Sequence, residues 1–218
     1  MVSTGLIDHG YSYISIDDGW SIKHAVAPGG PSPRDAQGNI RPNECFPDMK
    51  GLTAYVHSKG MKAGLYTSPA PLTCGKFEAS YGHEQQDADQ FAAWGFDLLK
   101  YDWCGYPAKD RSLAEMQEPY RLMGSILAAE PRGVLFSLCQ YGRGDVWTWG
   151  REGGRAALEN NWRPCLGPKG DYTSWENIVA DFDQGDRGKL IGPGGWNDLT
   201  ICSWVASPMS PSINILQT

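Results

Sequence analysis

Short apolar stretches that end in polar residues recur along the chain and set its predicted architecture. Four of them combine β-branched, aromatic and aliphatic residues in the way that strands do, and two weaker ones follow. We expect strands at 11–16, 61–66, 96–102 and 134–139, and further strand ends near 161–163 and 196–198.

Helical periodicity fills the stretches between these strands. Asp48 is placed to cap a helix whose apolar residues share one side and which ends at Gly60. Similar spacing predicts helices at 87–94, ended by Gly95, and at 116–127. Because strands and helices alternate, the sequence predicts an α/β fold with a parallel sheet.

A closed barrel fits this sequence better than an open nucleotide-binding sheet. The glycine-rich phosphate loop that such an open sheet carries after its first strand is missing from the sequence. In a (β/α)8 TIM barrel, the chemistry gathers at the carboxyl ends of the strands. Those ends carry polar side chains here, at Asp17, Asp18, Tyr66, Lys100, Asp102, Gln140, Arg163 and Asp198. We therefore predict a TIM barrel with its site at this end.

Tryptophans accompany these polar strand ends, at Trp20, Trp103, Trp162 and Trp196. Carboxylates accept hydrogen bonds from sugar hydroxyls, and indole faces can cover the apolar C–H face of a sugar ring. Two further carboxylates could act on a glycosidic bond, one as nucleophile and one as acid/base. The pattern therefore indicates a site for a neutral, polyhydroxylated ligand with aromatic platforms beside it.

Structural roles are open for the same residues. Asp17 and Asp18 could form a turn or a helix cap, and Asp171 could cap the helix that follows it. Lys100 and Asp102 lie two residues apart on one face of a strand, so a plain ion pair is as compatible with them as a catalytic pair. The spacing alone supports both interpretations.

Composition and charge argue against several classes of function. The chain has 218 residues with 19 basic and 25 acidic side chains, and a net charge of −6 without a basic stripe disfavours nucleic-acid binding. A run of about 18 apolar residues, which would predict a membrane span, is missing. The four histidines share no motif such as HExxH, so no metal site is expected. A glycine- and proline-rich loop at 28–47 is long enough to be a functional loop.

The cysteines form no CxxC pair, which disfavours a zinc knuckle. Disulfides and free buried thiols are both compatible with the spacing of the six residues, which are Cys45, Cys74, Cys104, Cys139, Cys165 and Cys202.

Three strings of the sequence together resemble one enzyme family. They are GYSYISIDDGW at 10–20, LKYDWC at 99–104 and GPGGWND at 192–198. In this order and spacing they closely resemble glycoside hydrolase family 27, the α-galactosidase and α-N-acetylgalactosaminidase family of clan D. The resemblance extends over residues 1–199.

The resemblance implies a role for each strand-end residue. Asp102 would be the nucleophile and form a covalent glycosyl-enzyme, so that the anomeric configuration is retained. Lys100 would bind sugar hydroxyls and hold Asp102 ionised, while Asp17 and Asp18 would grip the distal hydroxyls, including the axial one of galactose. Further substrate-binding residues would be Tyr66, Cys74, Cys104, Gln140, Arg163 and Asp198.

Two more assignments follow from the same resemblance. Gln140 would face the 2-substituent of the sugar, where its bulk leaves little room for an N-acetyl group and so favours α-galactosides. Asp171 would be the acid/base, since it is the only carboxylate between Arg163 and Trp175.

Cys74 and Cys104 match a family disulfide that borders the sugar site. The loop that this bridge closes would contribute about 3 kcal/mol to stability by chain-entropy arguments. The bridge favours a secreted, periplasmic or lysosomal-type compartment. The first residues, Met1 to Gly5, show no signal peptide.

We therefore predict a retaining exo-α-galactosidase that hydrolyses terminal α-D-galactosyl residues of oligosaccharides or polysaccharides, with no metal or organic cofactor and no nucleic-acid or membrane partner. About strands two to seven of the eight-stranded barrel are recognisable, in a partial catalytic domain at 1–199, and residues 200–218 form a tail without family likeness. The alternatives are an inactive barrel fragment that at most binds sugar, and the same fold acting on α-N-acetylgalactosaminides or β-L-arabinopyranosides.

Overall fold

The computed structural model describes most of the first 150 residues and short pieces of the remainder. The described ranges are 1–23, 30–110, 112–140, 143–150, 159–162, 189, 192, 194–197 and 213–216. At 159–162, at 213–216 and at Asn197, only the backbone is described.

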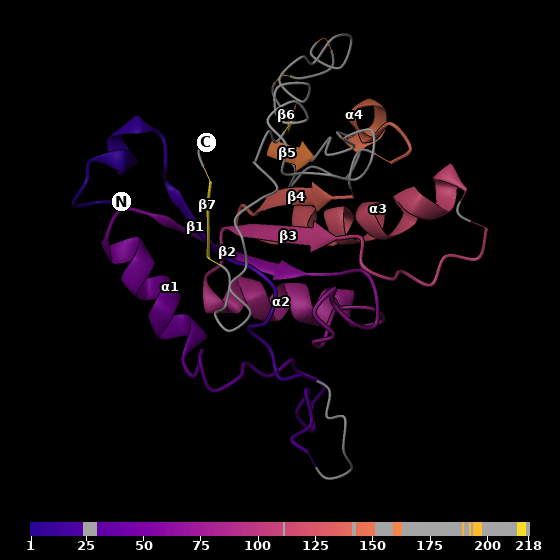
Figure 1. Cartoon of the computed structure of the whole chain (residues 1–218), viewed down its shortest axis with the longest axis horizontal. Helices are drawn as coiled ribbons and strands as arrows, with labels where there is room; N and C mark the ends of the chain where they lie inside the picture. Colours follow the sequence, from indigo (N-terminus) through magenta and orange to yellow (C-terminus); the bar gives the residue numbers. More distant parts are fainter. Residues whose placement is uncertain are drawn as a thin grey trace.

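Within these ranges, seven strands form a single sheet, with six of them parallel and in chain order (Figure 1). The parallel strands are β1 (Tyr13–Ile16), β2 (Lys62–Thr67), β3 (Leu98–Asp102), β4 (Leu135–Cys139), β5 (Glu159–Trp162) and β6 (Gly194–Asn197). All six strands predicted from the sequence are confirmed, with ends within about two residues of those expected, as is usual for element boundaries.

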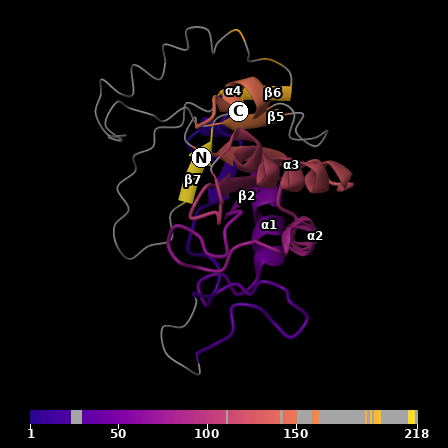
Figure 2. The same cartoon turned by 90° about the vertical axis from the view of Figure 1, so that its right-hand side faces the viewer.

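Three helices cover one face of the sheet, namely α1 (Met49–Ser58), α2 (Glu84–Trp94) and α3 (Leu113–Ala129). Figure 2 shows them together on the same side. A 3-10 helix, η1 (Leu6–His9), precedes β1, and the short α4 (Val146–Trp149) follows β4. The predicted alternation of strands and helices is therefore confirmed from β1 to β5.

The helix ends follow local chemistry. The Asp48 carboxylate accepts a hydrogen bond from the Gly51 amide at 2.8 Å, which caps α1 as expected. Gly95 ends α2 with a φ of 98°, and a Cβ at this position would lie only 2.9 Å from the Thr53 hydroxyl oxygen. The Thr53 hydroxyl also donates to the Trp94 carbonyl, so this tight approach joins the end of α2 to α1.

Alternation along the strands separates the two faces of the sheet. Leu65 and Leu99 point to the helix layer and are buried in the hydrophobic core between helices and sheet. Successive strand residues face opposite sides, so Tyr66, Lys100 and Asp102 project from the face away from the helices. The neighbouring strands place these polar side chains at similar heights, since Tyr66 pairs with Lys100 in register.

An antiparallel strand closes the β1 edge of the sheet. This strand, β7 (Ile213–Leu216), pairs with all four residues of β1, from Tyr13 opposite Leu216 to Ile16 opposite Ile213. It comes from the segment 200–218, for which the sequence predicts a tail. The end of the described chain is thus part of the same sheet as its beginning (Figure 1).

The loop predicted at 28–47 is docked on α2 through a buried arginine in its described part. The Arg34 guanidinium makes two hydrogen bonds with the Asp87 carboxylate, at 2.7 and 2.9 Å, and a third with Glu78 at 2.5 Å. The side chain of Asp87 is fully buried, and those of Arg34 and Glu78 are about one-tenth exposed. These contacts give this part of the loop a structural role.

No helix in the described ranges is both long enough and apolar enough to cross a membrane.

Candidate active site

Several polar residues predicted at the strand ends come together at the carboxyl ends of the parallel strands. Asp17 follows β1, Tyr66 lies in β2, Asp102 ends β3 and Gln140 follows β4. Parallel strands place their carboxyl ends on the same side, which explains why residues far apart in the sequence meet here.

An ion pair joins the turn after β1 to β3, across the strand β2 that lies between them. The ammonium nitrogen of Lys100 lies 2.7 Å from Oδ2 of Asp17, 83 residues away in the chain, and both side chains are about one-sixth exposed. The same nitrogen stands 5.1 Å from the centre of the Tyr66 ring. Asp17 is therefore held by a partner far away in the sequence, so its role is not limited to forming a local turn.

Tyr66 contacts the predicted nucleophile directly. Its hydroxyl donates a hydrogen bond to Oδ2 of Asp102 at 3.2 Å and lies 3.4 Å from the Cys104 sulfur. Burial, together with the negative charges of Asp102, Asp18 and Asp17, raises the pKa of Tyr66 far above its usual value. The phenol therefore remains a neutral donor toward the carboxylate at any physiological pH.

Asp18 is held from the loop that follows β2. Its Oδ2 accepts a hydrogen bond from the Gly75 amide at 2.6 Å, and Asp17 accepts one from the Asp18 amide at 2.9 Å. Burial raises the pKa of Asp18, as does the charge of Asp17, whereas the Thr73 hydroxyl and the amides of Gly75 and Gly19 act in the opposite direction. Its Oδ1 is buried and has no hydrogen-bond partner in the described part of the chain.

Gln140 presents a second buried acceptor. Its side chain is buried at the end of β4, and its Nε2 donates to the Arg143 carbonyl at 2.8 Å. Within the described ranges, its Oε1 has no hydrogen-bond partner. An unsatisfied buried acceptor costs about 1–3 kcal/mol, so Asp18 Oδ1 and Gln140 Oε1 both favour a ligand that brings hydroxyl donors.

A disulfide between Cys74 and Cys104 borders these groups, with Cα atoms 5.0 Å apart, as the family resemblance implies. Ligand atoms of the two cysteines and Asp102 lie within 4.8 Å of one another. Because both sulfurs are in the disulfide, they offer no thiolate to a metal. Cys45 is an exposed thiol and Cys139 a buried thiol outside this bridge, so the described cysteines include both disulfide and thiol forms.

The prediction that Trp20 is a platform for the sugar is wrong. Its side chain is 2% exposed and packs edge-on against Phe91 and Trp94 in the helix layer, with ring centres 5.7 and 5.8 Å away. The indole Nε1 donates to the Tyr66 carbonyl at 2.7 Å. Trp20 therefore anchors the Asp17–Asp18 turn to the end of β2 from behind.

Gly75 is a site residue that the sequence did not predict. It contributes a backbone amide to Asp18, and no side-chain type marks such a contact in advance. The available signal is weak, namely a glycine directly after Cys74.

Three predicted residues lie outside the described residues, namely Asp171, Arg163 and Asp198. The same holds for the side chain of Trp162.

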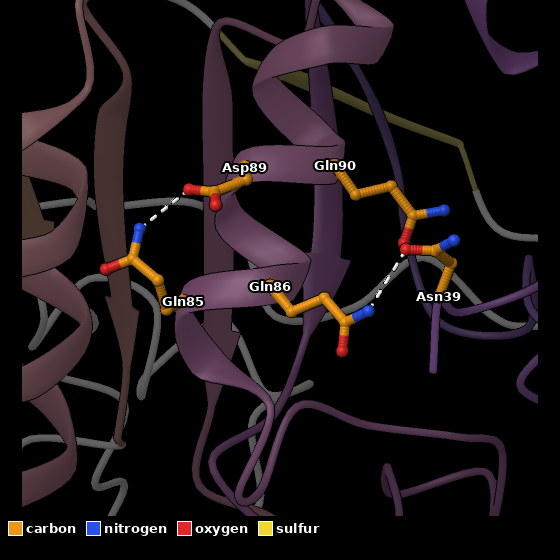
Figure 3. Close-up of a pocket in the computed structure, with 5 residues that line it drawn as sticks. All are labelled: Asn39, Gln85, Gln86, Asp89 and Gln90. Atoms are coloured by element: carbon orange, nitrogen blue, oxygen red, sulfur yellow. Dashed lines mark hydrogen bonds between the residues drawn. The ribbon is translucent and has the colours of Figure 1, made fainter. Parts of the chain in front are cut away.

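A pocket of about 600 Å³ lies on α2, lined by Asn39, Gln85, Gln86, Asp89 and Gln90 (Figure 3). The Gln86 amide donates to Oδ1 of Asn39 at 3.1 Å, and the Gln90 side chain pairs with both the amide and the carbonyl of Ile40. The side-chain amides of Gln86 and Gln90 thus attach the 35–40 turn to α2, and this structural role explains why they lie here.

Comparisons with known proteins agree with one another. A family model described as alpha galactosidase A matches residues 1–205. An alpha-galactosidase of Cyamopsis tetragonoloba is 39% identical over 201 residues, which cover 91% of this chain and 44% of that protein. The solved alpha-galactosidase I of Mortierella vinacea matches with a TM-score of 0.76 at 30% identity, over 91% of this chain and 51% of that one.

A second solved structure that matches is the alpha-galactosidase of Saccharomyces cerevisiae with raffinose, with a TM-score of 0.73 at 29% identity, over 89% of this chain and 45% of that one. The predicted TIM-barrel type of fold is confirmed by these matches. The chain spans about half the length, or less, of the relatives that it matches.

Proposed function

The chain belongs to the alpha galactosidase A family, glycoside hydrolase family 27, and on that premise we propose that it hydrolyses terminal α-D-galactosides with retention of configuration. Residues 1–199 would carry this activity. The substrates would be α-galactosyl oligosaccharides or polysaccharides, in keeping with the relative that was solved with raffinose.

The proposed reaction has two steps, both carried by carboxylates. Asp102 attacks the anomeric carbon while the glycosidic C–O bond breaks, and Asp171 gives its proton to the departing oxygen. Water then attacks the glycosyl-enzyme, Asp171 takes a proton from it, and Asp102 is released as a carboxylate. These steps assign no role to a metal or an organic cofactor.

The contacts around Asp102 support its role as nucleophile. The Tyr66 hydroxyl holds one carboxylate oxygen, which fixes the orientation of the group without taking its charge. Lys100 lies two residues before Asp102 on the same face of β3, and its ammonium group pairs with Asp17 beside it. A carboxylate whose orientation is fixed in this way is positioned for attack.

The two buried acceptors at the ends of β1 and β4 carry the proposal for a sugar ligand. Asp18 Oδ1 and Gln140 Oε1 need donors, and a hexose brings several hydroxyls to one place. Gln140 would accept from the 2-hydroxyl, and its volume disfavours a 2-N-acetyl group. Together with the family match, these acceptors favour galactose over its 2-N-acetyl analogue as the glycone.

The Cys74–Cys104 disulfide supports a proposal for the compartment. Disulfides persist in oxidising surroundings and are rare in a reducing cytosol. We therefore propose that the protein works in a secreted, periplasmic or lysosomal-type compartment.

Turnover of aryl glycosides by the purified 218-residue chain tests the proposed function. We expect hydrolysis of an aryl α-galactoside at a kcat/KM about tenfold or more above those for the α-N-acetylgalactosaminide and the β-L-arabinopyranoside. Proton NMR should show α-galactose as the first product, since retention requires it. Circular dichroism melting, run in parallel, should show a cooperative transition.

Other outcomes would replace the proposal by a stated alternative. Cooperative melting with galactose binding but no turnover would mean a sugar-binding fragment. Faster turnover of either competing glycoside would keep the fold and change the glycone, and β-galactose as first product would exclude the retaining mechanism.

Asp18→Asn should separate stability from binding. Because the pKa of Asp18 is raised in the fold, the unfolded chain loses the Asp18 proton first as the pH rises above the ordinary aspartate pKa of 3.8. The native state therefore loses stability between that pH and the native pKa. The asparagine does not ionise, so its melting temperature should exceed that of the wild type by an amount that grows from pH 3 and becomes constant above the native pKa.

The same variant should raise KM for an α-galactoside about tenfold, since a charged acceptor binds a hydroxyl more strongly than a neutral one. Differential scanning calorimetry across pH and steady-state kinetics give the two readouts. Asp8→Asn, at an exposed position in η1, is the control and should change neither. A melting-temperature gain that is equal at all pH values would contradict the burial argument.

A further inference from the structure

The turn that follows Cys74 packs directly on Asp18. It lies between β2 and α2, and its Gly75 amide is 2.6 Å from Oδ2 of an aspartate 57 residues earlier in the chain. This hydrogen bond leaves Oδ1 of Asp18 as the buried acceptor without a partner in the described part of the protein. The position of Gly75 therefore determines which carboxylate oxygen is left for a ligand.

A side chain at position 75 would crowd two neighbouring side chains. A Cβ there would lie 2.9 Å from Oδ2 of Asp18 and 3.1 Å from two ring carbons of Phe77. Separations this short are rarely tolerated, so a side chain at 75 must displace the carboxylate, the phenyl ring or both. Gly75 is not among the residues with positive φ, so backbone conformation does not explain the glycine.

Two sets of contacts hold the turn in place. Thr73 and Phe77 are joined by a hydrogen bond from the Thr73 amide to the Phe77 carbonyl and by another from the Phe77 amide to the Thr73 hydroxyl, both 3.0 Å long. The disulfide ties Cys74 to Cys104, which follows Asp102 by two residues. The Gly75 amide is thus positioned relative to the strand that carries Asp102.

We infer that Gly75 is a positioning residue that sets substrate affinity through Asp18. Its amide and its missing side chain fix the carboxylate so that Oδ1 faces the substrate, and the Cys74–Cys104 bridge holds the amide in place. The part of this inference that concerns substrate rests on the proposed function, whereas the positioning of Asp18 does not.

Gly75→Ala in the full chain tests the inference, with Gly133→Ala as its matched control. A Cβ on Gly133 would meet no atom within 4 Å, and Gly133 does not have a positive φ. Both variants replace a glycine by an alanine, so they lower the entropy of the unfolded chain equally. Gly75→Ala should raise KM for an aryl α-galactoside about 10- to 100-fold, the loss expected for a displaced charged hydrogen-bonding group, with kcat within about threefold. Gly133→Ala should leave both constants unchanged.

A double-mutant cycle distinguishes positioning from a general structural effect. In an Asp18→Asn background, Gly75→Ala should raise KM by less than about threefold, because its effect passes through the Asp18 carboxylate. A full 10- to 100-fold rise in that background would overturn the inference. If Gly75→Ala does not fold, Gly75→Ala with Phe77→Leu removes the ring contact and keeps the contact with Asp18, and the same KM values are expected of it.

A second readout does not depend on turnover. Carbon-13 NMR of the Asp18 carboxyl should give a higher pKa in Gly75→Ala than in the wild type, because the Gly75 amide favours the charged form. Gly133→Ala should titrate like the wild type, and an unchanged Asp18 pKa in Gly75→Ala would overturn the inference. If the wild type lacks turnover but the NMR shift is seen, the proposed function fails and the positioning of Asp18 stands.

Discussion

Asp102→Asn is expected to lower kcat for an aryl α-galactoside by at least about a thousandfold, the scale on which loss of a covalent nucleophile acts. An amide oxygen is too weak a nucleophile to form the glycosyl-enzyme. The Asn side chain keeps the shape of the carboxylate, and its oxygen can still accept from the Tyr66 hydroxyl. Steady-state kinetics with a sensitive fluorogenic galactoside measure the loss.

The fold and the sugar site should survive this substitution. The melting temperature of Asp102→Asn should stay near that of the wild type, and galactose should still bind in isothermal titration calorimetry. Asp89→Asn, at an exposed position on α2, serves as the control and should retain full turnover. Unchanged turnover in Asp102→Asn would mean that Asp102 is not the nucleophile, and the mechanism proposed above would be wrong.

Arg34→Met is expected to lower the free energy of unfolding by about 3–5 kcal/mol, because it leaves buried carboxylates without their counter-ion. The guanidinium of Arg34 binds Asp87 and Glu78, and it also donates to the carbonyls of Gly38 and Ala79 at 2.8 Å. Methionine keeps much of the volume but none of the donors. Urea unfolding monitored by tryptophan fluorescence gives the free energy.

Arg41→Met provides the matched control for this effect. Arg41 lies in the same loop but is exposed, and its guanidinium donates to the Ser32 carbonyl at 3.0 Å, so its loss should cost about 0.5 kcal/mol or less. Adding Asp87→Asn to Arg34→Met should recover part of the stability, since it removes one of the unpaired charges. Equal stability of the Arg34 and Arg41 variants would mean that the buried ion pairs contribute little.

The parallel strands were predictable because each combines apolar packing residues with a polar end. The start of α2 was not, since the helix begins at Glu84 and the sequence predicted 87. Its first turn is polar and carries no apolar periodicity, and contacts such as that between Gln86 and Asn39 stabilise it. The strand β7 was missed because it is stabilised by pairing with β1, and the sequence pattern does not show such a contact between distant segments.

The strand-end residues of the site were predictable from topology, and their partners were not. Parallel strands bring Asp17 and Lys100 to one edge whatever their distance in the sequence, but the hydrogen bond between them depends on three-dimensional geometry. The amide of Gly75 has no sequence signature as a donor to Asp18. Trp20 was misassigned because a tryptophan after a strand can point to either side of the sheet.

The charges of four side chains at the strand ends affect which ligands can bind. Asp17, Asp18 and Asp102 are acidic, whereas Lys100 is already paired with Asp17, so these four side chains together favour a negative local potential when ionised. Such a potential repels anionic sugars, including uronic acids and sulfated or phosphorylated glycans. It also favours a ring that gains positive charge as its glycosidic bond breaks, which is the charge development expected in glycoside hydrolysis.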